Sequence, residues 1–266
     1  MYDFNYHRPA SVAEARSLFD GADDGVYLAG GHTLLPAMKQ RLNAPSDLID
    51  LAGVTELRAI GEESGSLVVG ALSTHDSVAT SDVVRRAIPA LAALAGGIGD
   101  AQVRNRGTMG GSVANADPAA DYPAGVLGLG ATVRTDQREI AADDFFTGMF
   151  ETALNPGELI TSIAFPLVEA AAYVKFPNPA SRYATVGAFV SRHGGNVRVA
   201  VTGASPSAFR MTAMEEALAA DFTVAAIEGI RPDVHHMNED MHASAQYRAH
   251  LVGVMVGRAV GKILDQ

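Results

Sequence analysis

Residues 105–121 have the sequence Asn105-Arg-Gly-Thr-Met-Gly-Gly-Ser-Val-Ala-Asn-Ala-Asp-Pro-Ala-Ala-Asp121, a glycine-rich segment with acids near its end. Its glycines permit positive φ angles and let the backbone approach a ligand closely: Gly107, Gly110 and Gly111. Its small polar side chains offer hydrogen bonds: Thr108, Ser112 and Asn115. The segment is typical of a loop that holds a phosphate-bearing ligand, with a plain connecting turn as the alternative.

A second glycine-rich segment of the same kind lies upstream, Ala29-Gly-Gly-His-Thr-Leu-Leu-Pro36. The apolar run 26–29 predicts a strand before it, and Thr33 is placed to cap a helix that continues to Leu42. Backbone N–H groups at such a helix start carry partial positive charge and favour a phosphate without any Lys or Arg. His32 is a further candidate ligand, with a structural hydrogen bond as its alternative.

Composition limits the classes of partner. The chain has 266 residues, 48% of them hydrophobic, and a net charge of −10. Because no basic block interrupts this acidic chain, we expect neither nucleic acid nor an anionic membrane as a partner. The absence of cysteine excludes cysteine-ligated iron–sulfur clusters in this chain. No stretch is long and apolar enough to span a membrane, and no targeting segment is recognisable, so we expect a cytoplasmic location.

The remaining patterns predict an α+β protein. Ser11 and Glu14 form a capping box for a helix that Gly21 ends. Further patterns predict a strand at 47–51, a hairpin at 57–70, helices at 74–94 and strands at 131–134 and 158–166. A second hairpin with its turn at 194–196 and helices at 211–219, 224–230 and 243–264 follow. Strands followed by helices favour a separate C-terminal α+β unit.

Together with the late motif Asp240-Met-His-Ala-Ser-Ala-Gln-Tyr-Arg248, the two glycine segments resemble one family. This family is the medium, FAD-binding subunit of the molybdenum hydroxylases, which include carbon monoxide dehydrogenase and xanthine dehydrogenase. The resemblance covers nearly the whole chain. It implies a two-lobed FAD-binding domain of the vanillyl-alcohol-oxidase type with lobes at 1–54 and 55–167, followed by an α+β domain at 168–266.

The resemblance also implies which residues hold the FAD cofactor. Its pyrophosphate would lie between the two glycine segments, against Ala29, Gly30, Gly31, His32, Thr33, Leu34, Thr108, Gly110, Gly111 and Ser112. Ala101 and Asn115 would lie along the cofactor, Asp121 would accept a hydrogen bond from a sugar or ribityl hydroxyl, and Ile160 would contact the adenine side. Lys175 would stabilise the reduced, anionic flavin and Tyr183 would cover the isoalloxazine ring. From the residues alone, a surface lysine and a core tyrosine are the alternatives. Met109, where the family usually has isoleucine, is an apolar change of similar volume.

By the same resemblance, this chain relays electrons and carries no catalytic residue of its own. A large subunit would oxidise the substrate at a molybdenum cofactor, a small subunit would pass electrons through two [2Fe–2S] clusters, and an external acceptor would take them from the flavin. The expected assembly is a dimer of heterotrimers. Two other functions stay open: a self-sufficient FAD-dependent oxidase or dehydrogenase of the same fold, and a non-enzymatic binding protein that retains the fold. We expect no metal site, because His235, His236, His242 and His250 do not complete a set of ligands.

Overall fold

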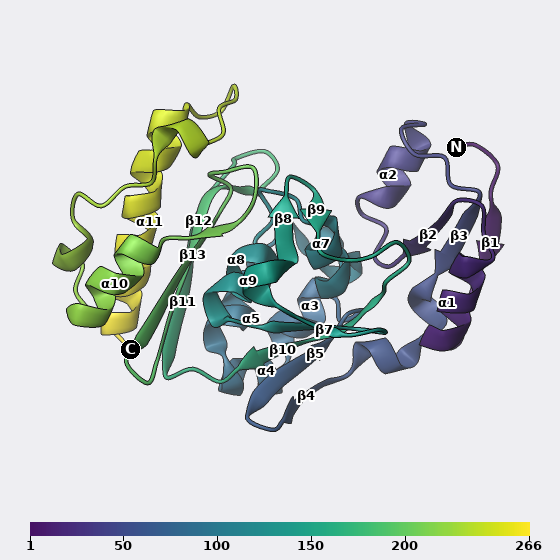
Figure 1. The fold of residues 1–266 in the computed structure, drawn as a ribbon, viewed down its shortest axis with the longest axis horizontal. Helices are drawn as coiled ribbons and strands as arrows, with labels where there is room; N and C mark the ends of the chain where they lie inside the picture. Colours follow the sequence, from purple (N-terminus) through teal and green to yellow (C-terminus); the bar gives the residue numbers. More distant parts are fainter.

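The computed structural model describes all residues from Met1 to Gln266. The three larger of its four sheets follow one another along the long axis of the molecule, from the N-terminal end to the C-terminal end (Figure 1). No helix combines the length and the apolar character needed to cross a membrane.

The N-terminal sheet is parallel and has the order β1-β3-β2. Its strands are β1 (Asn5–His7), β2 (Gly25–Leu28) and β3 (Asp47–Asp50). Helix α1 (Val12–Asp20) begins as the sequence predicts, because Ser11 accepts a hydrogen bond from the N–H of Glu14. Helix α2 (Leu34–Lys39) is shorter than predicted, since Arg41 turns into the left-handed region at φ 61°.

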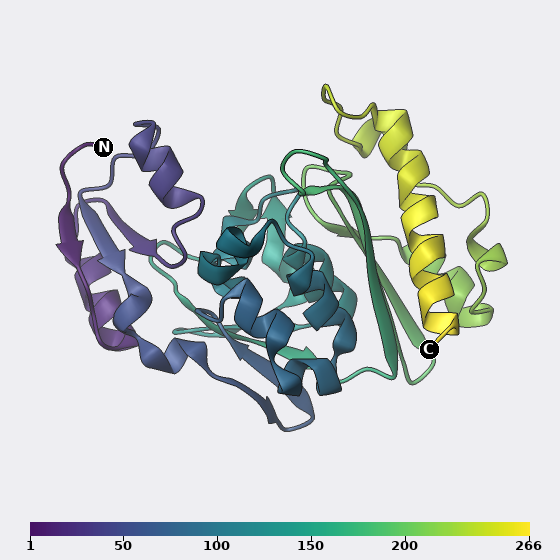
Figure 2. The ribbon, with the colours of Figure 1, turned by 180° about the vertical axis from the view of Figure 1, so that it is seen from behind.

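The central sheet has the order β4-β5-β10-β6-β7 and is antiparallel. Helices gather on one face of it (Figure 2). The predicted hairpin begins later than expected, at Ile60, because residues 55–58 form a 3₁₀ turn. The strands are β4 (Ile60–Glu63), β5 (Ser66–Gly70), β6 (Thr132–Thr135), β7 (Glu139–Ala141) and β10 (Ile160–Pro166). The helices are α3 (His75–Thr80), α4 (Asp82–Ala87), α5 (Pro89–Gly96), α6 (Ala101–Arg106), α7 (Met109–Asn115), α8 (Tyr122–Leu129) and α9 (Ala142–Phe145). Short elements complete this region: η1 (Leu51–Gly53), η2 (Thr55–Arg58), β8 (Phe146–Gly148) and β9 (Glu151–Thr152).

The C-terminal sheet is antiparallel with the order β11-β12-β13-β14. One face packs on α5 and α8, and the other is covered by the long C-terminal helix (Figures 1 and 2). The predicted hairpin turn is confirmed, since Gly194 and Gly195 both have positive φ between β12 and β13. The strands are β11 (Ala170–Pro177), β12 (Ala184–His193), β13 (Asn196–Thr202) and β14 (Phe209–Arg210). The helices are α10 (Thr212–Ala220) and α11 (Ala245–Leu264), with η3 (Ala225–Ile227) where an α-helix was predicted, and η4 (Val234–His236).

The largest hydrophobic core lies between the central sheet and its helices. Phe189 of β12 joins Leu91, Leu94 and Phe165 in this core, so apolar packing is continuous across residue 167. A second core lies between the C-terminal sheet and α11, and a third, smaller one beneath the N-terminal sheet. The α+β fold is confirmed, whereas the boundaries at 54 and 167 stay predictions.

The segment that the sequence predicts as a loop is largely helical. Thr108 caps α7, because its Oγ1 accepts a hydrogen bond from the N–H of Gly111 at 3.2 Å. Gly107, Gly110 and Gly111 all keep negative φ angles, so the positive φ that glycine permits is not used at these positions.

Candidate functional site

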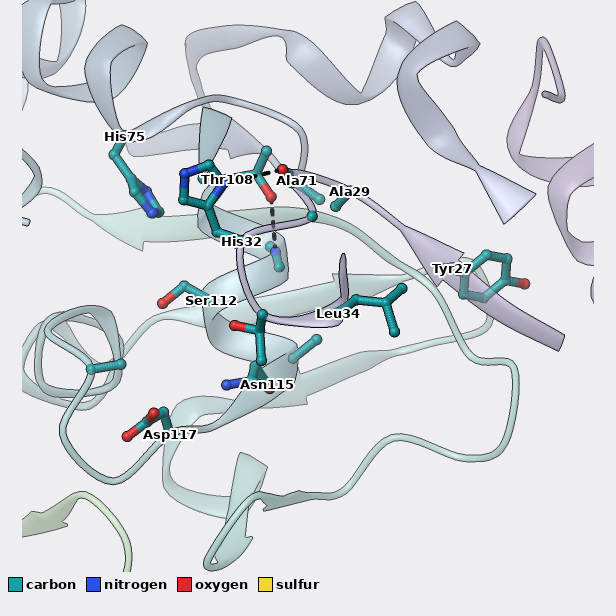
Figure 3. Close-up of a pocket in the computed structure, with 18 of the residues that line it drawn as sticks. Tyr27, Ala29, His32, Leu34, Ala71, His75, Thr108, Ser112, Asn115 and Asp117 are labelled. Atoms are coloured by element: carbon teal, nitrogen blue, oxygen red, sulfur yellow. Dashed lines mark hydrogen bonds between the residues drawn. The ribbon is translucent and has the colours of Figure 1, made fainter. Parts of the chain in front are cut away.

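A cavity of about 630 Å³ opens where the N-terminal region meets the central helices (Figure 3). The turn between β2 and α2 forms one wall, and α7 with the start of α3 forms another. Further lining residues include Ile98, Gly99, Val103, residues 158–160 and residues 181–183. This size is within the range of sites that enclose small organic ligands.

The first glycine segment leaves its backbone donors free. None of the N–H groups from Ala29 to Leu34 donates a hydrogen bond to a protein acceptor, and all of these residues line the cavity. The predicted cap is wrong, because the Thr33 side chain makes no capping hydrogen bond. Gly31 has φ +76°, a conformation that favours glycine. Consecutive free N–H groups in such a turn form a concave site for an anion.

The second segment uses its backbone donors within the protein. The N–H of Met109 donates to the carbonyl oxygen of Ser73 at 2.9 Å, and the N–H of Gly110 donates to that of Ala71 at 2.8 Å. The N–H groups of Gly111 and Ser112 both donate to Thr108. The side chains of Ser112 and Asn115 line the same cavity (Figure 3) and make no hydrogen bond to protein. This wall therefore offers side chains rather than backbone to a ligand.

The glycines of both segments permit close packing between pieces of the protein. A Cβ at Gly30 would overlap the carbonyl oxygen of Arg106, and one at Gly107 would lie 2.5 Å from Nε2 of His75. A Cβ at Gly110 would lie 2.5 Å from Cβ of Ala71. Gly110 thus allows α7 to pack on the chain after β5, which differs from the expected approach of a ligand.

The cavity wall carries few positive charges. Its lining contains one arginine, Arg182, against three carboxylates. Burial raises the pKa of Asp117, and a hydrogen bond from Arg138 lowers the pKa of Glu158 to about 2. Burial also lowers the pKa of His75 to about 4, so that ring is neutral near pH 7. An anion in this cavity meets dipoles and neutral hydrogen-bond donors rather than cations.

Asp121 and Lys175 lie in a buried network at the edge of the cavity. The Asp121 carboxylate accepts hydrogen bonds from the Tyr173 hydroxyl and from Nζ of Lys175, the latter at 3.0 Å. The same ammonium donates to the carbonyl oxygens of Gly97 at 2.9 Å and Arg182 at 2.8 Å. Lys175 therefore fixes the turn that carries Arg182, and it contributes no surface to the cavity.

The structure brings together nearly all of the residues predicted from the sequence. Those that line the cavity are Ala29, Gly30, Gly31, His32, Thr33, Leu34, Thr108, Gly110, Gly111, Ser112, Asn115, Asp121, Ile160 and Tyr183. Ala101, an exposed residue at the start of α6, and Lys175 do not line it. Their individual roles toward a ligand stay predictions.

Sequence reasoning missed several polar residues of the wall, among them His75, Asp117 and Arg182. Asp117 belongs to the segment 105–121, so the argument from its polar side chains could have included this residue. His75 gave no local signal, because the chain brings it to the cavity through packing against Gly107. Arg182 precedes Tyr183 directly and has φ 63°, which sequence does not reveal.

The residues present fit a dinucleotide with a central diphosphate, since a run of free N–H groups faces unpartnered Ser112 and Asn115 side chains across one cavity. The sequence profile of the family described as the FAD binding domain in molybdopterin dehydrogenase matches residues 2–168.

Full-length relatives agree. The chain is 36% identical over 274 residues to the carbon monoxide dehydrogenase medium chain of Hydrogenophaga pseudoflava, covering 97% of this chain and 96% of that one. It is 28% identical to the xanthine dehydrogenase FAD-binding subunit of Escherichia coli O157:H7, covering 98% and 97%. The solved structure of the Hydrogenophaga pseudoflava carbon monoxide dehydrogenase that lacks the Mo-pyranopterin moiety superimposes with a TM-score of 0.89 at 35% identity, covering 98% and 97%. This chain therefore belongs to the FAD-binding subunits of the molybdenum hydroxylases, a family of oxidoreductases, and its cofactor is FAD.

Proposed function

We propose that this chain transfers electrons within a molybdenum hydroxylase complex, from the [2Fe–2S] clusters of a partner subunit to an external acceptor. The observation that carries the proposal is the run of free N–H groups at Ala29 to Leu34, in a chain that matches medium subunits along its whole length. FAD, when bound, supplies the redox chemistry. The protein binds FAD and fixes its position.

Different residues around the cavity bind different parts of FAD. The free N–H groups of Ala29 to Leu34 hold the diphosphate, and Ser112 and Asn115 donate hydrogen bonds from the opposite wall. Tyr183, 44% exposed, covers the isoalloxazine ring from the mouth of the cavity. Lys175 acts indirectly, because its ammonium fixes the Asp121 carboxylate and the turn before Tyr183.

The partners follow from what this chain cannot hold. It has no cysteine, so iron–sulfur clusters that exchange electrons with its flavin belong to another chain. Relatives called medium chains support a complex with a large molybdenum-cofactor subunit and a small [2Fe–2S] subunit. A dimer of such heterotrimers and a location in the cytoplasm are part of this proposal.

The test compares the FAD-loaded chain alone with the chain in its complex, each under anaerobic conditions with a dye as acceptor. We expect the isolated chain to show flavin absorbance and to oxidise no small organic substrate. In the complex, we expect substrate to bleach the flavin and the dye to restore it. As a matched control, the complex assembled with FAD-free chain should still bleach the iron–sulfur absorbance but should not reduce the dye.

Two results would contradict the proposal. Efficient substrate oxidation by the isolated chain would favour a self-sufficient oxidase or dehydrogenase. Absence of flavin bands, with or without added FAD, would favour a non-enzymatic binding protein.

A further inference from the structure

His75 is the first residue of α3, and its ring forms part of the cavity wall beside His32 (Figure 3). Its backbone N–H donates to the carbonyl oxygen of Gly107 at 2.9 Å, which fixes the residue at the junction of α6 and α7. The residue is only 5% exposed. A titratable side chain is thus buried where the two glycine segments meet.

Neither ring nitrogen of His75 bonds to protein. Nδ1 is fully enclosed and has no partner. The Nε2 and Cδ2 edge faces Gly107, where a Cβ would lie 2.5 and 2.8 Å away. Buried polar groups in proteins are nearly always paired, and an exception calls for an explanation such as a missing ligand.

The surroundings of the ring keep it neutral. Burial is the main cause of its low pKa, and the neighbouring His32 and Arg104 add to this effect. Tyr122 packs against it with ring centroids 5.3 Å apart, and the Tyr122 hydroxyl is itself enclosed without a partner. A proton on the enclosed Nδ1 would be a buried donor without an acceptor. We therefore assign the proton of the neutral ring to Nε2, at the edge that is not enclosed and can donate to a ligand.

We propose that His75 is a further cofactor-binding residue, which donates one hydrogen bond from Nε2 to the diphosphate of FAD. The ring lies between His32, within the run of free N–H groups, and Gly107, which precedes the cap of α7. Gly30 touches the backbone of Arg106 and Gly107, so the first segment approaches the ring at this point. An anionic oxygen is the acceptor that gains most from a buried donor.

The proposal rests on the placement of the diphosphate at Ala29 to Leu34. It predicts that His75 recognises the phosphate part of the cofactor and not the flavin part. Two fragments separate these parts: ADP carries the diphosphate without flavin, and riboflavin carries the flavin without phosphate.

The experiment measures Kd for FAD, ADP and riboflavin with the full chain and two variants. His75→Leu removes the donor, and His75→Gln places a neutral N–H near the position of Nε2. We expect His75→Leu to weaken FAD and ADP binding about 10- to 100-fold, as for loss of a hydrogen bond to a charged group. We expect riboflavin binding to be unchanged and His75→Gln to restore most of the affinity.

Each other outcome overturns the proposal. Equal ADP affinity in all three proteins would make His75 a packing residue only, and a selective loss of riboflavin affinity would place it against the flavin. If the unaltered chain binds riboflavin but not ADP, the diphosphate does not lie at Ala29 to Leu34. The role of His75, which depends on that placement, is then contradicted as well.

A second measurement needs no variant. In histidine-labelled chain, nitrogen NMR reports the tautomer and charge of His75 directly. We expect a neutral ring protonated on Nε2 in FAD-free chain, and a shift of the Nε2 resonance on binding of FAD or ADP. Resonances that do not respond to ADP would overturn the proposal even if His75→Leu failed to fold.

Discussion

The two glycine segments look alike in sequence but use their backbones in opposite ways. From Ala29 to Leu34 the N–H groups remain free toward the cavity, whereas from Met109 to Ser112 each of them is paired within the protein. The difference begins at the helix caps. The Thr33 side chain accepts no hydrogen bond from the N–H groups of α2. The Thr108 side chain, by contrast, accepts a hydrogen bond from an N–H group of α7. A glycine-rich segment therefore indicates that something packs closely on its backbone. It does not tell whether this is a ligand or another part of the protein.

The largest expected effect concerns a glycine of the second segment. Gly110→Val places a branched side chain against the backbone and Cβ of Ala71, where even a Cβ lies at 2.5 Å. We expect a loss of about 3 kcal/mol or more in the free energy of unfolding of FAD-free chain, measured with urea. Gly61→Val is the control, since nothing lies within 4 Å of a Cβ there. If Gly110→Val had normal stability but had lost its affinity for FAD, Gly110 would contact the ligand rather than serve the packing of α7.

The next effect concerns His75 of α3, which packs against Gly107 of the second segment. Unfolded His75 takes up a proton near its ordinary pKa of 6.5, but the folded residue does so only at about 4. Between these values the unfolded state binds more protons, so stability falls as the pH is lowered from 6.5 to 4. The full loss is about 3 kcal/mol, at about 1.4 kcal/mol per pKa unit. His75→Gln should remove this part of the pH dependence; an unchanged slope in this variant would assign it to other groups.

Amide hydrogen exchange tests the comparison most directly. In FAD-free chain the amides of Ala29 to Leu34 should exchange rapidly, because nothing in the protein accepts their hydrogen bonds. FAD should slow them about tenfold or more, corresponding to about 1.4 kcal/mol for each tenfold. The amides of Met109 to Ser112 should already be slow before FAD is added. Equal behaviour of both segments would remove the distinction drawn between them.

The smallest effects separate affinity from stability within the second segment. Ser112→Ala should weaken FAD binding about threefold to tenfold, the range for one net hydrogen bond, and should change the stability of FAD-free chain by less than about 0.5 kcal/mol. Thr108→Val should instead lower that stability by about 1 kcal/mol, because its hydroxyl caps α7. Titration with FAD and urea unfolding measure the two quantities. The reverse pattern would mean that Thr108 faces the ligand.

The sequence was sufficient for the α+β class and for 14 of the residues that line the cavity. Local patterns mark a cap such as Ser11 and a turn such as Gly194, because both depend on neighbours in the chain. The use of Gly110 could not be predicted, since its neighbour Ala71 lies on another element. The sequence missed His75 and did not predict that Lys175 lies outside the cavity, because these positions depend on contacts with Gly107 and with Gly97 and Asp121.

The scarcity of cations in the cavity wall has a consequence for the choice of nucleotide. A diphosphate held by N–H dipoles is bound at short range, so its affinity should vary little with ionic strength. Of the three carboxylates in the wall, Glu158 is paired with Arg138 and Asp121 with Lys175, which leaves Asp117 without a cation. We therefore expect ATP, which shares the adenosine part of FAD but carries more negative charge, to bind more weakly than FAD, because the wall supplies few cations to balance that charge.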